Sequence, residues 1–317
     1  MKLDYLRVSI TDRCNLNCIY CRPRENVKLL QREELLRFEE IIKFVKLMLP
    51  RGLEKVRITG GEPLVRKDVI KLIGMIASIK QIKSITLTTN GVMLERFALD
   101  LKKAGLHRVN VSLDTLSREK FKMITGYDGL LRVLRGIKVA RKVGLEPLKI
   151  NTVVLRGIND TETLDFVNFA KDNSLVVRFI EYMPINGRGM NRWYVSNQVI
   201  KKIIEKKWGM LQPDFFPGNG PAEYFKLKNS DTVLGFISPI SKPFCQNCSK
   251  LRLSADGKLK PCLASNYEID IKNVLRKDNT ENEFNKVIKL VLDFKEKRRK
   301  ISPDFNTSGR FMFQIGG

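Results

Sequence analysis

A regular alternation of two kinds of segment through the first two thirds of the chain constrains its fold more than any other feature. Short β-branched or apolar runs, which predict strands, lie at residues 5–11, 55–59, 84–88, 108–113, 148–155 and 176–181. Longer amphipathic segments, which predict helices, lie at residues 32–48, 67–79, 96–104, 130–143, 161–173 and 196–207. Repeated strand–helix units favour a parallel sheet or barrel. Six units are visible, whereas a closed barrel has eight, so we expect an α/β fold built on an incomplete (βα)6 TIM-like barrel.

The pattern changes after residue 209. A stretch rich in proline and glycine follows at 213–221, and it leads to further short strands, expected at 224–228 and 233–238. A loop-rich cysteine region and a basic helix expected at 278–300 complete the chain. We therefore expect a partial barrel over residues 1–210 and an α+β region over residues 211–317.

Polar motifs follow directly after the expected strands. They are a cysteine loop after the first strand, Thr59-Gly60-Gly61-Glu62-Pro63 after the second, Thr88-Thr89-Asn90-Gly91 after the third and Ser112-Leu113-Asp114 after the fourth. In a parallel barrel the carboxyl ends of the strands share one face, and that face carries the active site. These motifs are thus expected to converge in space.

The cysteine loop contains Cys14, Cys18 and Cys21 in the run Cys-Asn-Leu-Asn-Cys-Ile-Tyr-Cys. Such close spacing on a polar loop is atypical of ordinary buried thiols, and it lets one turn aim three thiolates at a single site. Structural zinc normally takes four ligands. Three thiolates leave one iron of a four-iron cluster without a protein ligand, so this first triad favours a reactive iron–sulfur cluster.

A second triad consists of Cys245, Cys248 and Cys262. Two interpretations stay open for it. Zinc would need a fourth ligand; the only histidine of the chain, His107, is expected at the opposite end of the barrel, so that ligand would be a carboxylate. The other interpretation is a second cluster with one open iron, which suggests ligand binding.

The charge balance is strongly basic, with 58 Lys and Arg against 34 Asp and Glu, a net charge of +24. An excess of this size indicates either an anionic partner (nucleic acid, a membrane surface or a phosphorylated small molecule) or simply a solvated basic surface. No apolar run approaches the length of a membrane span, and the N-terminus shows no secretory signal. We therefore expect a cytoplasmic protein with reduced cysteines.

The first triad, with Tyr20 directly before its third cysteine, and the Gly60-Gly61-Glu62-Pro63 loop resemble the signature motifs of the radical S-adenosylmethionine superfamily. The resemblance implies that the open iron binds the amino and carboxylate groups of S-adenosylmethionine. It also implies four residues that bind this cofactor, namely Tyr20, Gly61, Ser112 and Met183.

Within this superfamily, three further features resemble the GTP 3′,8-cyclase family, which performs the first step of molybdenum cofactor biosynthesis. They are the second triad, the run Leu-Arg-Leu-Ser-Ala-Asp-Gly-Lys-Leu-Lys-Pro-Cys-Leu at 251–263 and the ending Gly316-Gly317. The resemblance implies that the open iron of a second four-iron cluster binds guanine, that the deoxyadenosyl radical removes hydrogen from the ribose 3′ carbon of GTP, and that the new carbon radical attacks C8.

The same resemblance assigns roles to residues. Gly316 and Gly317 are implied to assist the chemistry, and the six cysteines to hold two 4Fe–4S clusters. The implied GTP contacts are Arg7, Arg57, Thr88, Lys149, Lys250, Leu251 and Arg252. The family usually has arginine where this chain has Lys250; lysine keeps the charge but loses the planar fork of a guanidinium.

The implied partners are a reductase that donates electrons and a cyclic pyranopterin monophosphate synthase that receives the product. We expect no membrane or nucleic-acid partner, and a homodimer stays open. Two rival interpretations remain at this point. One is a radical enzyme with an auxiliary cluster that modifies a peptide or RNA, and the other is a zinc-stabilised RNA-binding module without catalysis.

Overall fold

One continuous sheet organises the fold. The computed structural model describes residues 3–22, 27–185, 190–215, 220–278, 280–298 and 310–316. Its first six strands are β1 (Tyr5–Ser9), β2 (Lys55–Thr59), β3 (Ser84–Thr89), β4 (Arg108–Ser112), β5 (Lys149–Val154) and β6 (Val176–Glu181). They pair in parallel and in chain order, and each end agrees with the sequence prediction within two residues.

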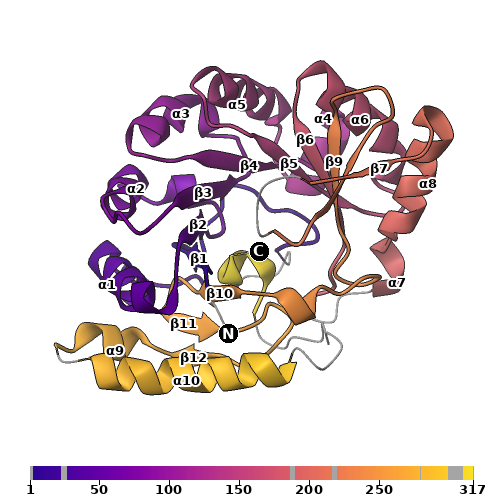
Figure 1. The fold of residues 1–317 in the computed structure, drawn as a ribbon. Helices are drawn as coiled ribbons and strands as arrows, with labels where there is room; N and C mark the ends of the chain where they lie inside the picture. The colour runs from indigo at the N-terminus through magenta and orange to yellow at the C-terminus, as the bar shows by residue number, and fades with distance from the viewer. Residues whose placement is uncertain are drawn as a thin grey trace.

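Helices connect these strands and cover the outer face of the sheet (Figure 1). They are α1 (Phe38–Met48), α2 (Val69–Ala77), α3 (Leu94–Lys103), α4 (Arg118–Thr125), α5 (Leu130–Lys142), α6 (Thr163–Asp172) and α8 (Asn197–Trp208), with a short α7 (Met190–Trp193) between α6 and α8 in the chain. The first helix was predicted to begin at residue 32, which is wrong. Leu36 N–H instead donates to the carbonyl of Ala255 at 2.8 Å, so this tertiary contact holds the chain extended before α1. Helix α4 was not predicted.

The C-terminal region extends the same sheet at both ends. β9 (Val233–Ile237) pairs in parallel with β6, and β10 (Lys250–Leu253) pairs in parallel with β1. Antiparallel strands then flank them: β8 (Glu223–Lys226) and β7 (Gln212–Asp214) beyond β9, and β11 (Lys258–Lys260) and β12 (Ile269–Asp270) beyond β10. The sheet keeps two ends, so the α/β architecture with an incomplete barrel is confirmed. A division at residue 210 stays a prediction, because both regions share this sheet.

Alternation along the strands separates an apolar layer from a polar interior. Leu6 and Val8 of β1 and Val56 of β2 are fully buried in the hydrophobic core. Arg7 lies between Leu6 and Val8, Arg57 follows Val56, and the two arginines are neighbours in register. Successive strand side chains point to opposite faces, so the arginines project to the inside of the barrel. On these strands the face that points into the barrel is therefore basic, and the opposite face is apolar.

Three C-terminal helices complete the described structure. α9 (Lys272–Arg276) and α10 (Glu281–Arg298) lie along the outside next to α1, where Phe284 packs edge-on against Phe44 with ring centroids 5.6 Å apart. The short α11 (Met312–Ile315) lies inside the curve of the sheet, as Figure 1 shows in yellow. Among the described residues, no helix combines the length and apolar character needed to cross a bilayer.

Candidate active site

The first triad lies on the loop that follows β1, and backbone contacts fix this loop. The N–H groups of Asn17 and Ile19 donate to the end of α4, at 2.8 and 2.9 Å. The Cys14 Sγ accepts from the backbone N–H of Leu16 at 3.4 Å and lies 3.9 Å from the Asn90 amide nitrogen. Hydrogen bonds of this kind to sulfur support a thiolate that ligates a cluster.

Electrostatics in the loop favour a bound cation. Burial raises the pKa of Cys14 to about 11, and burial together with the negative charges of Cys14 and Asp114 raises the pKa of Cys21 to about 12. Burial also raises the pKa of Cys18 well above its ordinary value. Thiols in this state lose their protons when metal supplies the compensating positive charge, so the donor set fits an iron–sulfur cluster.

The glycine loop after β2 packs directly on this cysteine loop. Gly61 N–H donates to the Thr11 carbonyl at 2.7 Å, and Glu62 N–H donates to the Arg13 carbonyl at 2.8 Å. A Cβ added at Gly60 would lie 2.6 Å from the Thr11 oxygen, which is closer than side chains tolerate. Glycine is therefore required here so that the two loops can approach each other.

Tyr20 lies in the first cysteine loop, and Ser112 ends the strand that leads to Asp114, the partner of Tyr20. The Tyr20 hydroxyl donates to Asp114 Oδ2 at 2.6 Å, and Asp114 Oδ1 accepts from Val153 N–H at 2.9 Å. Burial raises the pKa of Asp114 to about 6. Ser112 ends β4 and is half-buried opposite Asn151 of β5. Asp114, which sequence reasoning did not select, thus joins the cluster loop to the ends of two strands.

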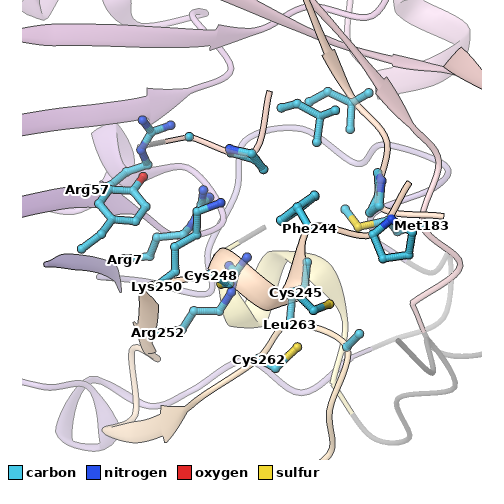
Figure 2. A pocket seen from close by; sticks show the side chains of 18 of the residues that line it. Arg7, Arg57, Met183, Phe244, Cys245, Cys248, Lys250, Arg252, Cys262 and Leu263 are labelled. Atoms are coloured by element: carbon cyan, nitrogen blue, oxygen red, sulfur yellow. The ribbon is translucent and has the colours of Figure 1, made fainter. Parts of the chain in front are cut away.

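The second triad borders a cavity of about 220 Å³ inside the barrel. Cys245, Cys248 and Cys262 all line it, and each is half-buried. Figure 2 shows the cations along one side of this cavity and Met183 across from them. The structure therefore brings Met183 to the second triad's cavity, together with residues from both regions of the chain.

A buried lysine supports the second triad. The Lys295 ammonium of α10 lies 3.5 Å from Cys248 Sγ and donates to the Lys250 and Pro261 carbonyls at 2.8 and 3.0 Å. Only 4% of Lys295 is exposed. Burial opposes ionisation of Cys248, but the charges of Lys295 and Lys250 lower its pKa overall. Sequence reasoning missed Lys295 because it lies in a helix with many solvated lysines.

Basic side chains form most of the charged lining of the cavity. Among the described residues that line it, six are basic and none is a carboxylate: Arg7, Arg57, Arg178, Lys250, Arg252 and Lys295. Burial and mutual repulsion lower the pKa of Arg7 to about 9 and burial lowers that of Arg178 to about 10. Such repulsion is relieved by a polyanionic ligand. Arg178, on β6, was not selected from the sequence.

The basic lining continues deeper into the barrel. Arg57 and Arg178 also border a neighbouring cavity, together with Lys149. Lys149 Nζ donates to the Tyr224 hydroxyl at 2.9 Å. Burial, followed by repulsion from Arg178, lowers the pKa of Lys149 to about 6. The predicted contact residue Lys149 is thus near the other cations.

The two remaining predicted contacts differ in their placement. Thr88 Oγ1 accepts from Arg57 at 3.5 Å and so belongs to the basic lining. The side chain of Leu251 is 1% exposed and lies in the hydrophobic core on the opposite face of β10 from Lys250 and Arg252. A contact between Leu251 and a ligand would therefore come from its main chain.

The tail reaches the same cations. The carbonyl oxygen of Gly316 accepts from Arg7 at 3.0 Å and from Arg252 at 3.1 Å. Gly316 has a φ of +69°, and a Cβ there would lie 2.6 Å from the Thr59 methyl carbon. Both the backbone conformation and the close packing require glycine. Gly317 lies outside the described residues.

Neither triad forms a single-ion site in the described structure. No three His, Cys, Asp or Glu side chains among the described residues are placed to hold one metal ion. A four-iron cluster takes one thiolate at each of three irons and does not need them to meet at one ion. His107 lies apart from both triads, since its Nδ1 accepts from Ile85 N–H at 3.1 Å on the amino end of β3.

Comparisons with known proteins match both regions. The family model "Radical SAM superfamily" matches residues 8–170, and the family model "Molybdenum Cofactor Synthesis C" matches residues 175–301. A GTP 3′,8-cyclase of Petrotoga mobilis is 46% identical over 99% of this chain and 98% of that protein. A GTP 3′,8-cyclase of Thermodesulfovibrio yellowstonii is 48% identical over 90% of this chain and 89% of that protein.

This chain belongs to the GTP 3′,8-cyclase family. The resemblance seen in the motifs is thereby confirmed, and family membership argues against both rivals, the peptide- or RNA-modifying enzyme and the RNA-binding module. The fold agrees with that of Streptococcus suis SuiB bound to S-adenosylmethionine, with a TM-score of 0.60 and 17% identity over 89% of this chain and 68% of that chain.

Proposed function

We infer that the chain converts GTP into (8S)-3′,8-cyclo-7,8-dihydroguanosine 5′-triphosphate, the first step of molybdenum cofactor biosynthesis, as a lyase of the radical S-adenosylmethionine superfamily. One 4Fe–4S cluster and S-adenosylmethionine belong to this activity. The observation that carries the substrate assignment is the cavity with six cations, no carboxylate and the second triad at its border.

Cys14, Cys18 and Cys21 are proposed to hold the first cluster. S-adenosylmethionine bound to it supplies the radical that removes hydrogen from the ribose 3′ carbon. We assign Tyr20, Gly61, Ser112 and Met183 to this cofactor. The support is positional. Tyr20 lies in the cysteine loop, Gly61 donates to Thr11 at the start of that loop, and Ser112 ends the strand that leads to Asp114, the partner of Tyr20. Met183 lies across the cavity that would hold the nucleotide. A closed site protects a reactive radical from water and side reactions.

Cys245, Cys248 and Cys262 are proposed to hold a second 4Fe–4S cluster, with zinc as the competing possibility. The support is that all three cysteines line one cavity and that the ammonium of Lys295 lies beside Cys248. A cation in hydrogen-bonding distance of a ligating sulfur stabilises the negative charge of a cluster. The open iron would face the cavity, where a guanine base can bind.

Arg7, Arg57, Thr88, Lys149, Lys250 and Arg252 are proposed to bind the triphosphate, with Leu251 contributing its main chain. Arginine forks hold phosphate oxygens in bidentate geometry, and lysine acts as a point charge. The Gly316 carbonyl uses only part of the donors of Arg7 and Arg252, because each guanidinium has five N–H groups. Gly316 and Gly317, the proposed catalytic tail, would thus lie next to the bound nucleotide.

The partners are proposals of the same kind. A cytoplasmic reductase would supply the electrons, and a cyclic pyranopterin monophosphate synthase would take the product. The six free cysteines agree with a reducing compartment. No nucleic-acid or membrane partner is proposed, and a homodimer is left open. A triphosphate neutralises only part of the +24 charge.

The experiment that tests this function is turnover after anaerobic reconstitution. Reconstituted protein should hold about eight irons per chain, as expected for two four-iron clusters, and incubation with dithionite, S-adenosylmethionine and GTP should yield 5′-deoxyadenosine and cyclised GTP. About four irons, or zinc, would contradict the two-cluster proposal. Cleavage of the cofactor with GTP left intact would contradict the substrate assignment.

GTP binding is expected to take up a proton at Lys149. Its pKa is lowered to about 6 in the ligand-free site, so the amine is neutral at pH 8; a bound triphosphate favours the charged form and raises this pKa. Affinity for GTP therefore falls as the pH rises above about 6, by up to about tenfold per unit for this group. Calorimetry at pH 8 in buffers of different ionisation enthalpy measures the uptake.

The matched variants are Lys149→Met and Lys171→Met, the second at an exposed lysine of α6. Lys149→Met should lower the proton uptake by about one, and Lys171→Met should leave it unchanged. Equal uptake in wild type and Lys149→Met would show that Lys149 does not meet the triphosphate.

A further inference from the structure

The described tail, residues 310–316, contacts three separate parts of the molecule. Its first residue, Arg310, pairs with carboxylates of the C-terminal region. In its middle, the Arg22 guanidinium, directly after Cys21 in sequence, lies 5.4 Å from the centre of the Phe313 ring. Near its end, the Gly316 carbonyl meets Arg7 and Arg252. The tail thus joins the second region to the first triad and to the basic cavity.

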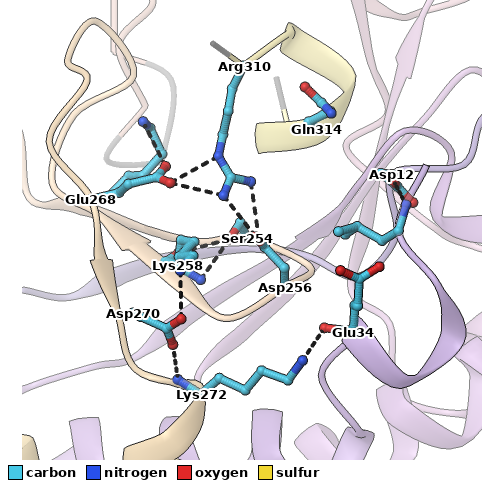
Figure 3. Close-up of polar contacts among 12 residues, drawn as sticks. Asp12, Glu34, Ser254, Asp256, Lys258, Glu268, Asp270, Lys272, Arg310 and Gln314 are labelled. Carbon is cyan, nitrogen blue, oxygen red and sulfur yellow. Dashed lines mark hydrogen bonds and ion pairs between the residues drawn. The ribbon is translucent and has the colours of Figure 1, made fainter. Parts of the chain in front are cut away.

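Arg310 makes the strongest of these contacts. Its NH1 and NH2 donate to both oxygens of Asp256 at 3.2 and 2.8 Å, and its Nε and NH2 donate to Glu268 Oε1 at 3.1 and 2.9 Å (Figure 3). The side chains of Arg310, Asp256 and Glu268 are only 23%, 15% and 24% exposed. A bidentate, largely buried pairing of this kind fixes both position and direction of the guanidinium.

The two carboxylates are themselves held in place. Asp256 lies in the turn between β10 and β11, where Ser254 Oγ donates to its Oδ1 at 2.5 Å. Glu268 accepts from Lys260 Nζ at 3.3 Å, and Lys260, on β11, also donates to the Ser265 carbonyl at 3.0 Å. This hairpin carries Arg252 at one end and leads to Cys262 at the other. Arg310 therefore anchors the tail to the hairpin that carries Arg252, a proposed GTP contact, and leads to Cys262, a proposed cluster ligand.

We propose that Arg310 is a positioning residue that sets the register of the tail, so that Phe313 meets the first cluster loop and Gly316 meets Arg7 and Arg252. Gly316 follows Arg310 by six residues, which span at most about 20 Å. With Arg310 fixed, a shift of the anchor moves the tail backbone relative to both contacts. This inference rests on the proposed catalytic role of the tail.

The tail also gives the first cluster loop a contact that the barrel does not supply. Phe313 is 3% exposed, and its ring lies next to Arg22, the residue that follows Cys21. The reduction potential of a cluster depends on its exposure to solvent. Releasing the tail is therefore expected to leave a spectroscopic trace at the first cluster as well as a kinetic one.

The test compares reconstituted wild type, Arg310→Ala and Arg310→Lys. In Arg310→Ala, chymotrypsin should cleave after Phe313 at least about tenfold faster, because losing hydrogen bonds to charged groups raises the population of the open tail by that order. 5′-deoxyadenosine formation with GTP present should fall at least about tenfold, and the reduction potential of the first cluster should differ from that of wild type. Arg310→Lys, which keeps the charge, should recover part of each effect.

Iron content and the GTP dissociation constant are measured in parallel and should change less than about twofold. Arg276→Ala is the matched control. Arg276 lies on α9, outside the site, and the substitution removes its ion pair with Glu40, in which the two charged groups are 2.7 Å apart. Its cleavage and turnover should equal wild type. If the wild-type enzyme formed no cyclised GTP, that result would contradict the proposed function but not the proposal that Arg310 anchors the tail.

Three results would overturn the anchor while leaving the function intact. One is normal turnover in Arg310→Ala. Another is lost turnover with wild-type protection of Phe313 and an unchanged potential. The third is loss of iron in step with activity, which would show that Arg310 acts through a cluster and not through the tail.

Discussion

Replacing Cys14, Cys18 and Cys21 together by alanine is expected to abolish formation of 5′-deoxyadenosine. The three thiols are the only cysteines on the β1 loop. Burial raises the pKa of each one, so the thiolates form when a bound metal balances their negative charge. Iron should fall from about eight to about four per chain. Chromatography of the nucleoside products and iron analysis measure both effects.

The matched variant replaces Cys245, Cys248 and Cys262 by alanine. It should lose the same amount of iron but keep cleavage of S-adenosylmethionine, whereas cyclised GTP should be absent, because the base is no longer fixed against the ribose. Equal loss of cofactor cleavage in both variants would contradict the division of labour between the triads. Unchanged iron in the second variant would contradict a second cluster.

Replacing Arg252 by alanine is expected to weaken GTP binding by about 30-fold or more, since removing one member of a buried charge pairing costs at least about 2 kcal/mol. Arg252 lines the cavity, is half-buried and already donates to Gly316. Equilibrium binding of GTP to the reconstituted enzyme, measured without reductant, gives the change.

The control series uses the neighbouring position. Lys250→Arg should tighten GTP binding, because a guanidinium adds a second hydrogen bond to a phosphate. Arg252→Lys should fall between wild type and Arg252→Ala. If Arg252→Ala bound GTP as tightly as wild type, the triphosphate would lie elsewhere.

The sequence predicted the first six strands well, and it placed the loop with Cys14, Cys18 and Cys21 directly after β1, because both features are local. Strand–helix periodicity appears in neighbouring residues, and the spacing of Cys14, Cys18 and Cys21 follows one turn of chain. The extension of the sheet by β9 and β10 was not predicted, because parallel pairing between strands that are distant in sequence, such as Tyr5 with Lys250, leaves no local pattern. The late start of α1 was missed for the same reason, since it depends on a hydrogen bond between Leu36 and the distant Ala255.

The same distinction holds in the site. Family motifs pointed to Arg252 and the second triad, but Arg178 and Lys295 reach the cavity only in the folded chain, through β6 and α10. On a linear chain with 58 basic residues, nothing separates these two from solvated charges. Leu251 shows the reverse case: it lies between two cavity cations in sequence, yet strand alternation turns its side chain into the core.

In the proposed reaction a hydrogen atom leaves the ribose 3′ carbon of GTP in this cavity. The most direct measurement uses GTP deuterated at that carbon, with reconstituted enzyme, dithionite and S-adenosylmethionine, and mass spectrometry of both products. We expect one deuterium in 5′-deoxyadenosine and its loss from the cyclised nucleotide. Unlabelled 5′-deoxyadenosine, with the deuterium retained in GTP or in the cyclised nucleotide, would contradict this reaction.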